Sequence, residues 1–398
     1  MTDQTTATLP ATDQATFSRT GLLFGALCLV ALIAPLVHVK PNRILAGEGL
    51  ALPLALNAPI GWVISATLLA LTAATLSRRR RAMQLVGLAL IGLGLTILSL
   101  GLAARQLSPE GNAIIRIAPG WGFWLLVLVF AMMLVDALAR VRLALRWRLA
   151  ALVLGTGGLL SLLTSGWFDH VSVMVEYHLR QDMFRDSLHQ HVALAFGSLA
   201  LALCVGVPLG VAAHAFRRLG GPLLAGLNII QTIPSLALFG LLIPLFGWVA
   251  STIPGAAAVG VAGIGRFPAL VALFLYALLP VVSNTRAGLD AVSPPVHDAA
   301  VSLGMTRLQI LWQVELPLAL PAILAATRIV LVQNIGLTVI AGLIGGGGFG
   351  SFVFQGLNQA STDMILLGAL PTICLAVLAG LTLDLAVEAT GGTARGPA

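Results

Sequence analysis

The chain has 398 residues, of which 58% are apolar and only 9% are charged. An ordinary soluble domain carries about 25% charged residues, so this composition excludes a soluble enzyme, a disordered chain and a nucleic-acid-binding protein. The net charge is +7, and 21 of the 22 basic residues are arginine; in a membrane protein such residues stay in the loops on the cytoplasmic side. The sequence predicts an all-α integral membrane protein.

A membrane-spanning helix needs about 20 apolar residues, and ten stretches meet this requirement. They lie at roughly 21–39, 58–76, 82–104, 119–138, 149–167, 190–213, 223–247, 267–285, 318–344 and 364–387. Residues 1–20 are polar and lack the basic start of a signal peptide, so they predict a disordered cytoplasmic tail. Residues 389–398 predict a short C-terminal tail.

The basic residues in the loops predict the topology. If the N-terminus lies inside, 14 basic residues fall in inside loops and seven fall in outside loops. This bias predicts that both termini are cytoplasmic. The strongest single signal is the run of four arginines at 78–81. A stop-transfer anchor is the favoured interpretation of this run, and binding of anionic lipid headgroups is the alternative.

The chain divides into two halves around an extracytoplasmic linker at 169–189, which is polar and predicted to be helical. The five spans of 21–168 are almost free of polar residues and predict an accessory region. The five spans of 190–388 carry Pro, Gln, Asn and Thr, which are expensive in hydrocarbon and line pathways. In the linker, His189 and His191 are two residues apart and lie on different helix faces, so a solvated or docking surface is favoured over a metal site.

The loop at 286–317 is the most informative segment. Pro294 and Pro295 end the preceding helix. Apolar residues at helical spacing predict a short amphipathic helix over 296–303, and Gly304 is a natural stop. A second short helix is predicted over 306–314. Two short helices on the cytoplasmic face are suited to docking another protein.

The spacing within this loop resembles the EAA loop of the permeases of binding-protein-dependent ABC importers. The matching residues are Asp298, Ala299, Ala300, Gly304, Leu316 and Pro317. The family usually has Glu at the first position and often Ile where this chain has Val314, and both replacements keep the chemistry. The resemblance implies that this loop docks on a separate ATPase subunit and transmits its closure.

Further motifs resemble the osmoprotectant branch of these permeases. They are Gln231–Leu238, Tyr276–Pro280, Asn284–Arg286, Gly304–Ile310 and Glu315–Pro321. The resemblance covers about residues 185–388 and implies a type I permease core that moves glycine betaine, choline or a related solute. It also implies an extracytoplasmic substrate-binding protein and a second permease subunit, identical or homologous. The alternatives are another small solute, such as an amino acid or a sulfonate, and an ion-coupled secondary transporter.

ATP hydrolysis is assigned to another chain. A P-loop needs a Gly-Lys-Ser/Thr sequence, and the only lysine is Lys40. The segment Gly345–Gly350 is rich in glycine and predicts a flexible turn. We therefore expect a transport subunit that is not an enzyme and binds no metal or cofactor itself, with ATP and magnesium on the partner ATPase.

The translocation path is predicted from polar residues inside or beside the spans of the second half. The candidates are Gln231, Thr232, Pro234, Ser235, Asn284, Gln333, Asn334 and Thr338. Structural hydrogen bonding between helices is the equal alternative for these residues. Arg328 is expected to snorkel or to pair with a carboxylate rather than to contact solute.

Overall fold

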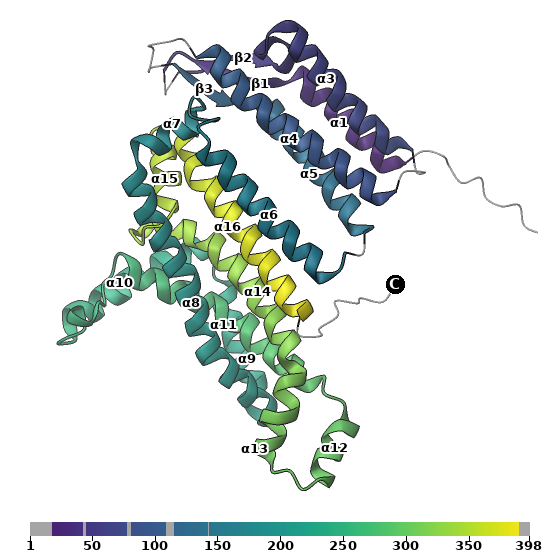
Figure 1. Cartoon of the computed structure of the whole chain (residues 1–398). Coiled ribbons are helices and arrows are strands. Elements are labelled where there is room, and N and C mark those ends of the chain that lie inside the picture. The colour runs from purple at the N-terminus through teal and green to yellow at the C-terminus, as the bar shows by residue number, and fades with distance from the viewer. Residues whose placement is uncertain (1–17, 43–44, 78–80, 109–114, 142, 390–398) are drawn as a thin grey trace, which may run out of the picture. The chain divides into compact units, whose positions relative to one another are not determined.

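The computed structural model describes residues 18–42, 45–77, 81–108, 115–141 and 143–389 (Figure 1). Nine helices of this described part are long and apolar enough to span a membrane, and a tenth apolar helix is shorter. Most of both expected tails and most of the four-arginine run lie outside the described residues. The chain forms two compact units, the first made of 1–143 and 160–175 and the second of 144–159 and 176–398.

Unit 1 packs four apolar helices beside a small sheet. The helices are α1 (Arg19–Ile33), α3 (Ala58–Ala73), α4 (Ala82–Leu107) and α5 (Trp121–Ala139). The strands β1 (Pro35–Lys40), β2 (Glu48–Ala51) and β3 (Arg116–Pro119) pair antiparallel in the order β2-β1-β3, and the single turn α2 (Leu52–Ala55) follows β2. Small residues permit close packing, and Gly92 lies directly against the ring of Phe130.

The first predicted span is shorter than expected. We predicted a helix over 21–39, but α1 ends at Ile33 and the chain enters β1 at Pro35. Proline has no N–H to continue a helix, and it also disfavours the helical conformation of the residue before it. The hydrophobicity of this stretch therefore continues into a strand whose Leu36 and Val37 are buried in the core of unit 1.

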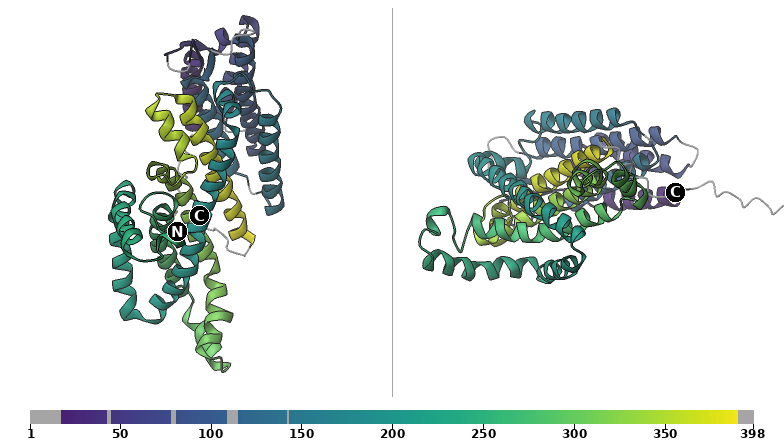
Figure 2. Two further views of the ribbon diagram at one scale, coloured as in Figure 1. Left: turned by 90° about the vertical axis from the view of Figure 1, so that its left-hand side faces the viewer. Right: turned by 90° about the horizontal axis from the view of Figure 1, so that it is seen from below.

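Unit 2 is built around α11 (Arg266–Asp290), which packs against α8 (Gln181–Ala215), α9 (Arg217–Thr232), α10 (Ser235–Thr252) and α14 (Leu316–Ala341) (Figure 1, Figure 2). The helix α16 (Thr362–Ala389) covers α14 and α15 (Gly350–Asn358). Gly206 of α8 meets Val281 of α11, so the two helices approach closely. The 286–317 loop lies at one end of this unit and α15 at the other (Figure 1). We call these the loop end and the α15 end.

The predicted span 223–247 is wrong as a single helix. The chain breaks at Ile233 and Pro234, where α9 ends and α10 begins. Pro234 cannot donate a backbone hydrogen bond, and the hydroxyl of Tyr276 donates to the carbonyl of Ile233 at the break. The helix α10 then packs one face on the start of α11, where Phe246 meets Phe267, and leaves apolar residues such as Trp248 exposed on its other side.

The expected linker 169–189 forms α7 (Ser172–Leu179) and the start of α8. The predicted continuous helix is interrupted at Arg180, whose backbone is not helical. The sixth span therefore begins at Gln181 instead of at residue 190. The fifth span is α6 (Leu145–Thr164), and its first 15 residues belong to unit 2, where Arg148 pairs with Glu388 of α16.

Candidate functional site: the 286–317 loop and the polar core

The first part of the loop is the helix α12 (Pro294–Ser302), which starts at two prolines whose fixed φ suits a first turn. It ends in a Schellman motif. The N–H of Met305 donates to the carbonyl of Ala300 at 3.2 Å, and the N–H of Gly304 donates to that of Val301 at 2.9 Å. Gly304 has φ +77°, a left-handed conformation that glycine adopts without strain. The predicted stop at Gly304 is confirmed.

The predicted second short helix is wrong as a separate element. Thr306 caps the turn α13 (Arg307–Ile310) by accepting a hydrogen bond from the N–H of Gln309. A π-helical turn at Leu311–Glu315 then runs directly into α14. Pro317 lacks the N–H that an unbroken α-helical ladder needs, and wider π turns form where that ladder is interrupted. The second half of the loop is thus the first part of a membrane span.

Three contacts between polar or charged side chains hold the loop in place, and they involve residues outside the six positions of the EAA resemblance. His297 of α12 contacts Glu315 of the π turn at 3.1 Å. At the base of the loop, Asp290 contacts His214 at 2.6 Å and Arg286 at 3.3 Å. These contacts tie α12 to the start of α14 and join the ends of α8 and α11. The sequence carried no signal for the contacts His297–Glu315 and His214–Asp290, whose partners are 18 and 76 residues apart, whereas Arg286 and Asp290 are at i,i+4 on one helix.

The loop presents an apolar surface outside the bundle. Ala300 packs inward with Ile310, and both are buried. Asp298, Ala299 and Gly304 are exposed. Leu303 has 82% of its surface exposed, and Leu308 and Trp312 are also exposed. Leu316 is half-buried and Pro317 exposed where α14 begins. An exposed patch of this kind marks a protein interaction site.

Four of the predicted path residues lie at the break between α9 and α10. The carboxamide of Gln231 donates to the carbonyl of Tyr276 at 2.8 Å, and the hydroxyl of Thr232 donates to that of Ile229 at 2.7 Å. Pro234 is exposed and Ser235 is half-buried. Of these, Gln231 ties α9 to α11, which is a structural hydrogen bond between helices.

A second polar group lies inside the bundle between α8 and α14. Asn334 is fully buried and donates to the hydroxyl of Ser198 at 2.8 Å. Thr338 is also fully buried and donates to the carbonyl of Asn334 at 2.6 Å. The Oδ1 atom of Asn334 has no partner among the described residues. A buried acceptor left in this way costs about 1–3 kcal/mol, so a polar group here needs a reason beyond packing.

The remaining path candidates are less buried. The carboxamide of Asn284 donates to the carbonyl of Pro280, four residues earlier on the same helix, at 2.8 Å. This local hydrogen bond does not link α11 to a neighbouring helix. Gln333 is half-buried next to Asn334. The structure thus brings Asn334 and Thr338 together inside the bundle. Four other candidates lie together at the break between α9 and α10, Asn284 lies apart on α11, and Gln333 is the less buried neighbour of Asn334 on α14. Arg328 was expected to pair with a carboxylate, and in the structure it pairs with Asp384 of α16.

The glycine-rich segment is not the flexible turn we expected. The N–H of Gly348 donates to Oε1 of Gln190 at 3.1 Å, and the N–H of Phe349 donates to Nδ1 of His191 at 3.3 Å. The Nε2 atom of His191 contacts the carbonyl of Ile335 at 3.0 Å. His191 is fully buried, so it does not belong to a solvated surface. Backbone donors of the segment are therefore fixed by two adjacent side chains of α8.

Gly350 is expected to tolerate no side chain. A Cβ atom there would lie 1.9 Å from the carbonyl oxygen of Val339. We expect Gly350→Ala to lower the free energy of unfolding by about 1–3 kcal/mol, because backbone must move to admit the methyl group. Gly336→Ala is the matched control, since it meets no atom within 4 Å and favours the helix. Thermal unfolding of both purified variants measures the difference, and equal midpoints would contradict the close contact.

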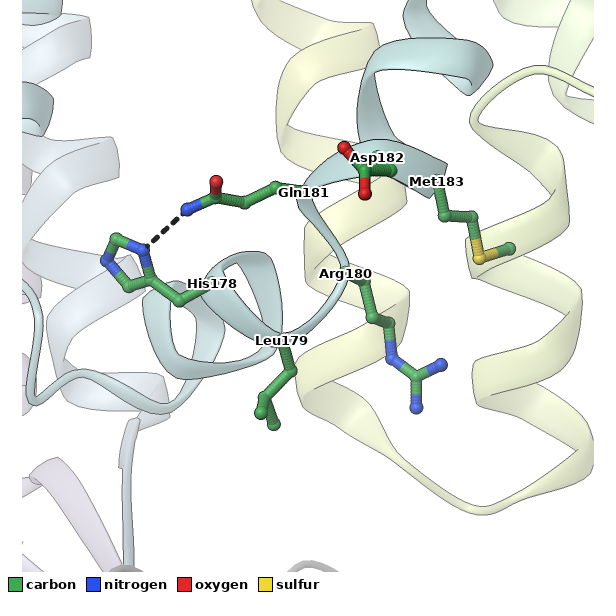
Figure 3. Close-up of a pocket in the computed structure, with 6 residues that line it drawn as sticks. All are labelled: His178, Leu179, Arg180, Gln181, Asp182 and Met183. Carbon is green, nitrogen blue, oxygen red and sulfur yellow. Dashed lines mark hydrogen bonds between the residues drawn. The ribbon is translucent and has the colours of Figure 1, made fainter.

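The α15 end carries a shallow hollow of about 390 Å³ at the junction of α7 and α8 (Figure 3). Its lining residues are consecutive, from His178 to Met183. Gln181 turns toward His178 and contacts it at 3.0 Å (Figure 3), and Arg180 pairs with Glu176 at 3.2 Å. This hollow is the inside of a local turn. Among the described residues, no three metal-ligating side chains lie together.

These features define a class of protein: a multi-pass membrane protein with an exposed helical loop at 286–317. Residues 202–391 match the family described as binding-protein-dependent transport system inner membrane component, and residues 18–174 match the ABC transporter permease YehY N-terminal domain. The chain belongs to the family of binding-protein-dependent inner-membrane permeases of ABC importers. Membership implies an ATPase and a substrate-binding protein as partners, and it decides against the ion-coupled secondary transporter.

Curated relatives match about half of the chain. The osmoprotectant import permease protein OsmW of Salmonella typhimurium is 41% identical over 48% of this chain and 83% of its own length. The glycine betaine/carnitine/choline transport system permease protein OpuCD of Bacillus subtilis is 37% identical over 49% of this chain and 79% of its own length. Among solved structures, the MetNI methionine ABC transporter matches 53% of this chain and 97% of its own, at 23% identity and a TM-score of 0.47.

Proposed function

We propose that this chain is the permease subunit of an ATP-driven importer of osmoprotectants such as glycine betaine or choline. The observation that carries the proposal is the 41% identity to an osmoprotectant import permease across 83% of that protein. The permease named for glycine betaine, carnitine and choline supports the same class of cargo. Recognition with high affinity is assigned to the separate binding protein.

Coupling to the ATPase is proposed to run through residues 298–317. Asp298, Ala299 and the turn at Gly304 face outward, where a second protein can reach them. The π turn continues into α14, so a displacement of the docked loop moves a span directly. The hydrogen bond between His297 and Glu315 links α12 to the start of that span, so the two are proposed to move together.

The other functions of the importer are proposed to belong to other chains. ATP and magnesium are assigned to the ATPase, and this chain is proposed to catalyse no reaction. A second permease subunit, identical or homologous, is proposed to complete the pathway, and both termini are proposed to be cytoplasmic. Gln333, Asn334 and Thr338 of α14 are proposed to line the path together with Gln231, Thr232, Pro234, Ser235 and Asn284. The unpartnered Oδ1 atom of Asn334 supports this for α14.

Uptake of labelled glycine betaine and choline tests the proposal. The host lacks its own solute importers and expresses this chain with its neighbouring genes. We expect uptake that is lost when the ATPase gene is deleted. A well-assembled complex that takes up neither solute would contradict the cargo assignment and leave an amino acid or a sulfonate as the alternative.

A further inference from the structure

A second hollow lies between α8 and α11 at the α15 end of unit 2. It has a volume of about 340 Å³ and is lined by Asp186, His189, Gln190 and Ala193 of α8 and by Arg266, the first residue of α11. These residues come from two helices that pack side by side (Figure 1). The hollow therefore depends on the packing of the core and differs from the local turn at 178–183. Ligand pockets start at roughly 300 Å³, so it has room for a small solute.

The two charged side chains of this hollow are unpaired. Neither Asp186 nor Arg266 has an ion pair or a hydrogen bond within the described residues. The charged residues nearby do have partners: Arg185 lies 4.0 Å from Asp182, and Arg180 pairs with Glu176. Opposite charges that face one hollow and do not neutralise each other are available to a ligand that carries both signs.

Gln190 adds a fixed donor. Its Oε1 atom accepts from the N–H of Gly348, and this contact determines which way the carboxamide faces. The NH₂ group of Gln190 has no partner in the described part of the chain. A guanidinium and an amide NH₂ together suit a carboxylate, whereas the carboxylate of Asp186 suits a cation. No Trp, Tyr or Phe side chain lines the hollow, so a cation is attracted here mainly by the charge of Asp186.

We propose that this hollow is a low-affinity transit site for a small zwitterionic solute. Arg266 and the NH₂ group of Gln190 hold its carboxylate, and Asp186 holds its cationic group. The inference rests on the proposed function, because the bound solute is taken to be one that the complex transports. A site of this kind favours solutes that bear a carboxylate over choline, which has none. Because Gln190 also holds Gly348, an occupied site contacts the segment that joins α14 to α15.

Binding is measured on the purified complex of this permease with its ATPase in lipid nanodiscs, without the binding protein. The probes are glycine betaine, which is a zwitterion, and choline, which is a cation, and the readout is saturation-transfer NMR. We expect the wild-type complex to give a stronger signal for glycine betaine. Arg266→Gln should weaken glycine betaine binding roughly three- to tenfold and leave choline unchanged, and Arg266→Lys should retain part of it. Asp186→Asn should weaken both.

Arg185→Gln and Asp182→Asn are the matched controls, because both residues are exposed on α8 and neither lines the hollow. Equal glycine betaine signals from the wild type and Arg266→Gln would overturn the proposal. So would variants of Arg266 or Asp186 that bind both solutes normally but no longer engage the liganded binding protein, since the hollow would then be a docking surface.

Cellular uptake is measured in parallel. A wild type that imports neither solute contradicts the proposed function, whereas normal import without NMR binding contradicts only the transit site.

Discussion

Gly304→Val is expected to lower ATP-dependent uptake of glycine betaine at least tenfold while the protein still inserts into the membrane. Gly304 has φ +77° and no atom within 4 Å of an added Cβ, so the cost is backbone strain. A left-handed conformation costs an L-residue roughly 1–2 kcal/mol, and a β-branched residue tolerates it least. The Schellman turn then opens, and α12 no longer presents Asp298 and Ala299 in one orientation.

Gly260→Val is the matched control for this experiment. Gly260 has φ +90° and equally open surroundings, and it lies in the segment between α10 and α11, outside the docking loop. We expect the same strain with little loss of uptake. Gly304→Asn should be intermediate, because asparagine adopts the left-handed conformation more readily. Co-purification of the ATPase distinguishes lost docking from lost folding, and undiminished uptake by Gly304→Val would remove the coupling role of the turn.

Arg328→Met is expected to lower the free energy of unfolding in lipid nanodiscs by about 3 kcal/mol. Arg328 of α14 pairs with Asp384 of α16, and the two side chains are 47% and 30% exposed in the protein alone. Loss of the arginine leaves the charge of Asp384 unpaired, and an unpaired charge at the centre of a membrane-spanning helix costs roughly 2.5–3.5 kcal/mol. The double variant Arg328→Met with Asp384→Leu removes both charges and should recover most of the stability.

Arg148→Met provides the comparison for this second variant. Its partner Glu388 is the second-last residue of α16, so the freed carboxylate reaches water by snorkelling. We expect a loss below about 1 kcal/mol, as for an exposed ion pair. Titration with denaturing detergent measures all three variants. A double variant as unstable as Arg328→Met would show that the arginine acts through packing and not through the charge of Asp384.

Composition and periodicity predicted much of the molecule. Helices of membrane-spanning length follow from the need to satisfy every backbone group within the segment, and most predicted spans are present within a few residues of the expected bounds. The turn at Gly304 was predictable because only local backbone geometry decides it. Two of the errors occur at proline: Pro35 ends α1 early, and Pro234 divides one expected span into α9 and α10. A hydropathy profile does not show where a proline interrupts the backbone hydrogen bonds of a helix.

The polar contacts were not predictable in the same way. The sequence marked Asn334 and Thr338 as costly residues in a span, but it gave no sign that Asn334 reaches Ser198 on α8. It assigned His191 to a solvated surface, whereas packing buries the ring between α14 and the glycine-rich segment. A histidine within a helix looks the same in the sequence whether it meets water or another helix.

The sequence by itself determined that this is a multi-pass permease whose 286–317 loop resembles the EAA loop, because hydrophobic length and a short motif are properties of contiguous residues. Only the tertiary structure decided which side chains meet. The pairs Arg328–Asp384 and His297–Glu315, the contacts of Gln190 and His191 with the glycine-rich segment, and the unpaired charges of Asp186 and Arg266 all depend on how helices distant in the chain pack. Such contacts carry no local pattern, since their energy comes from the exclusion of water and lipid between helices rather than from the order of residues along one of them.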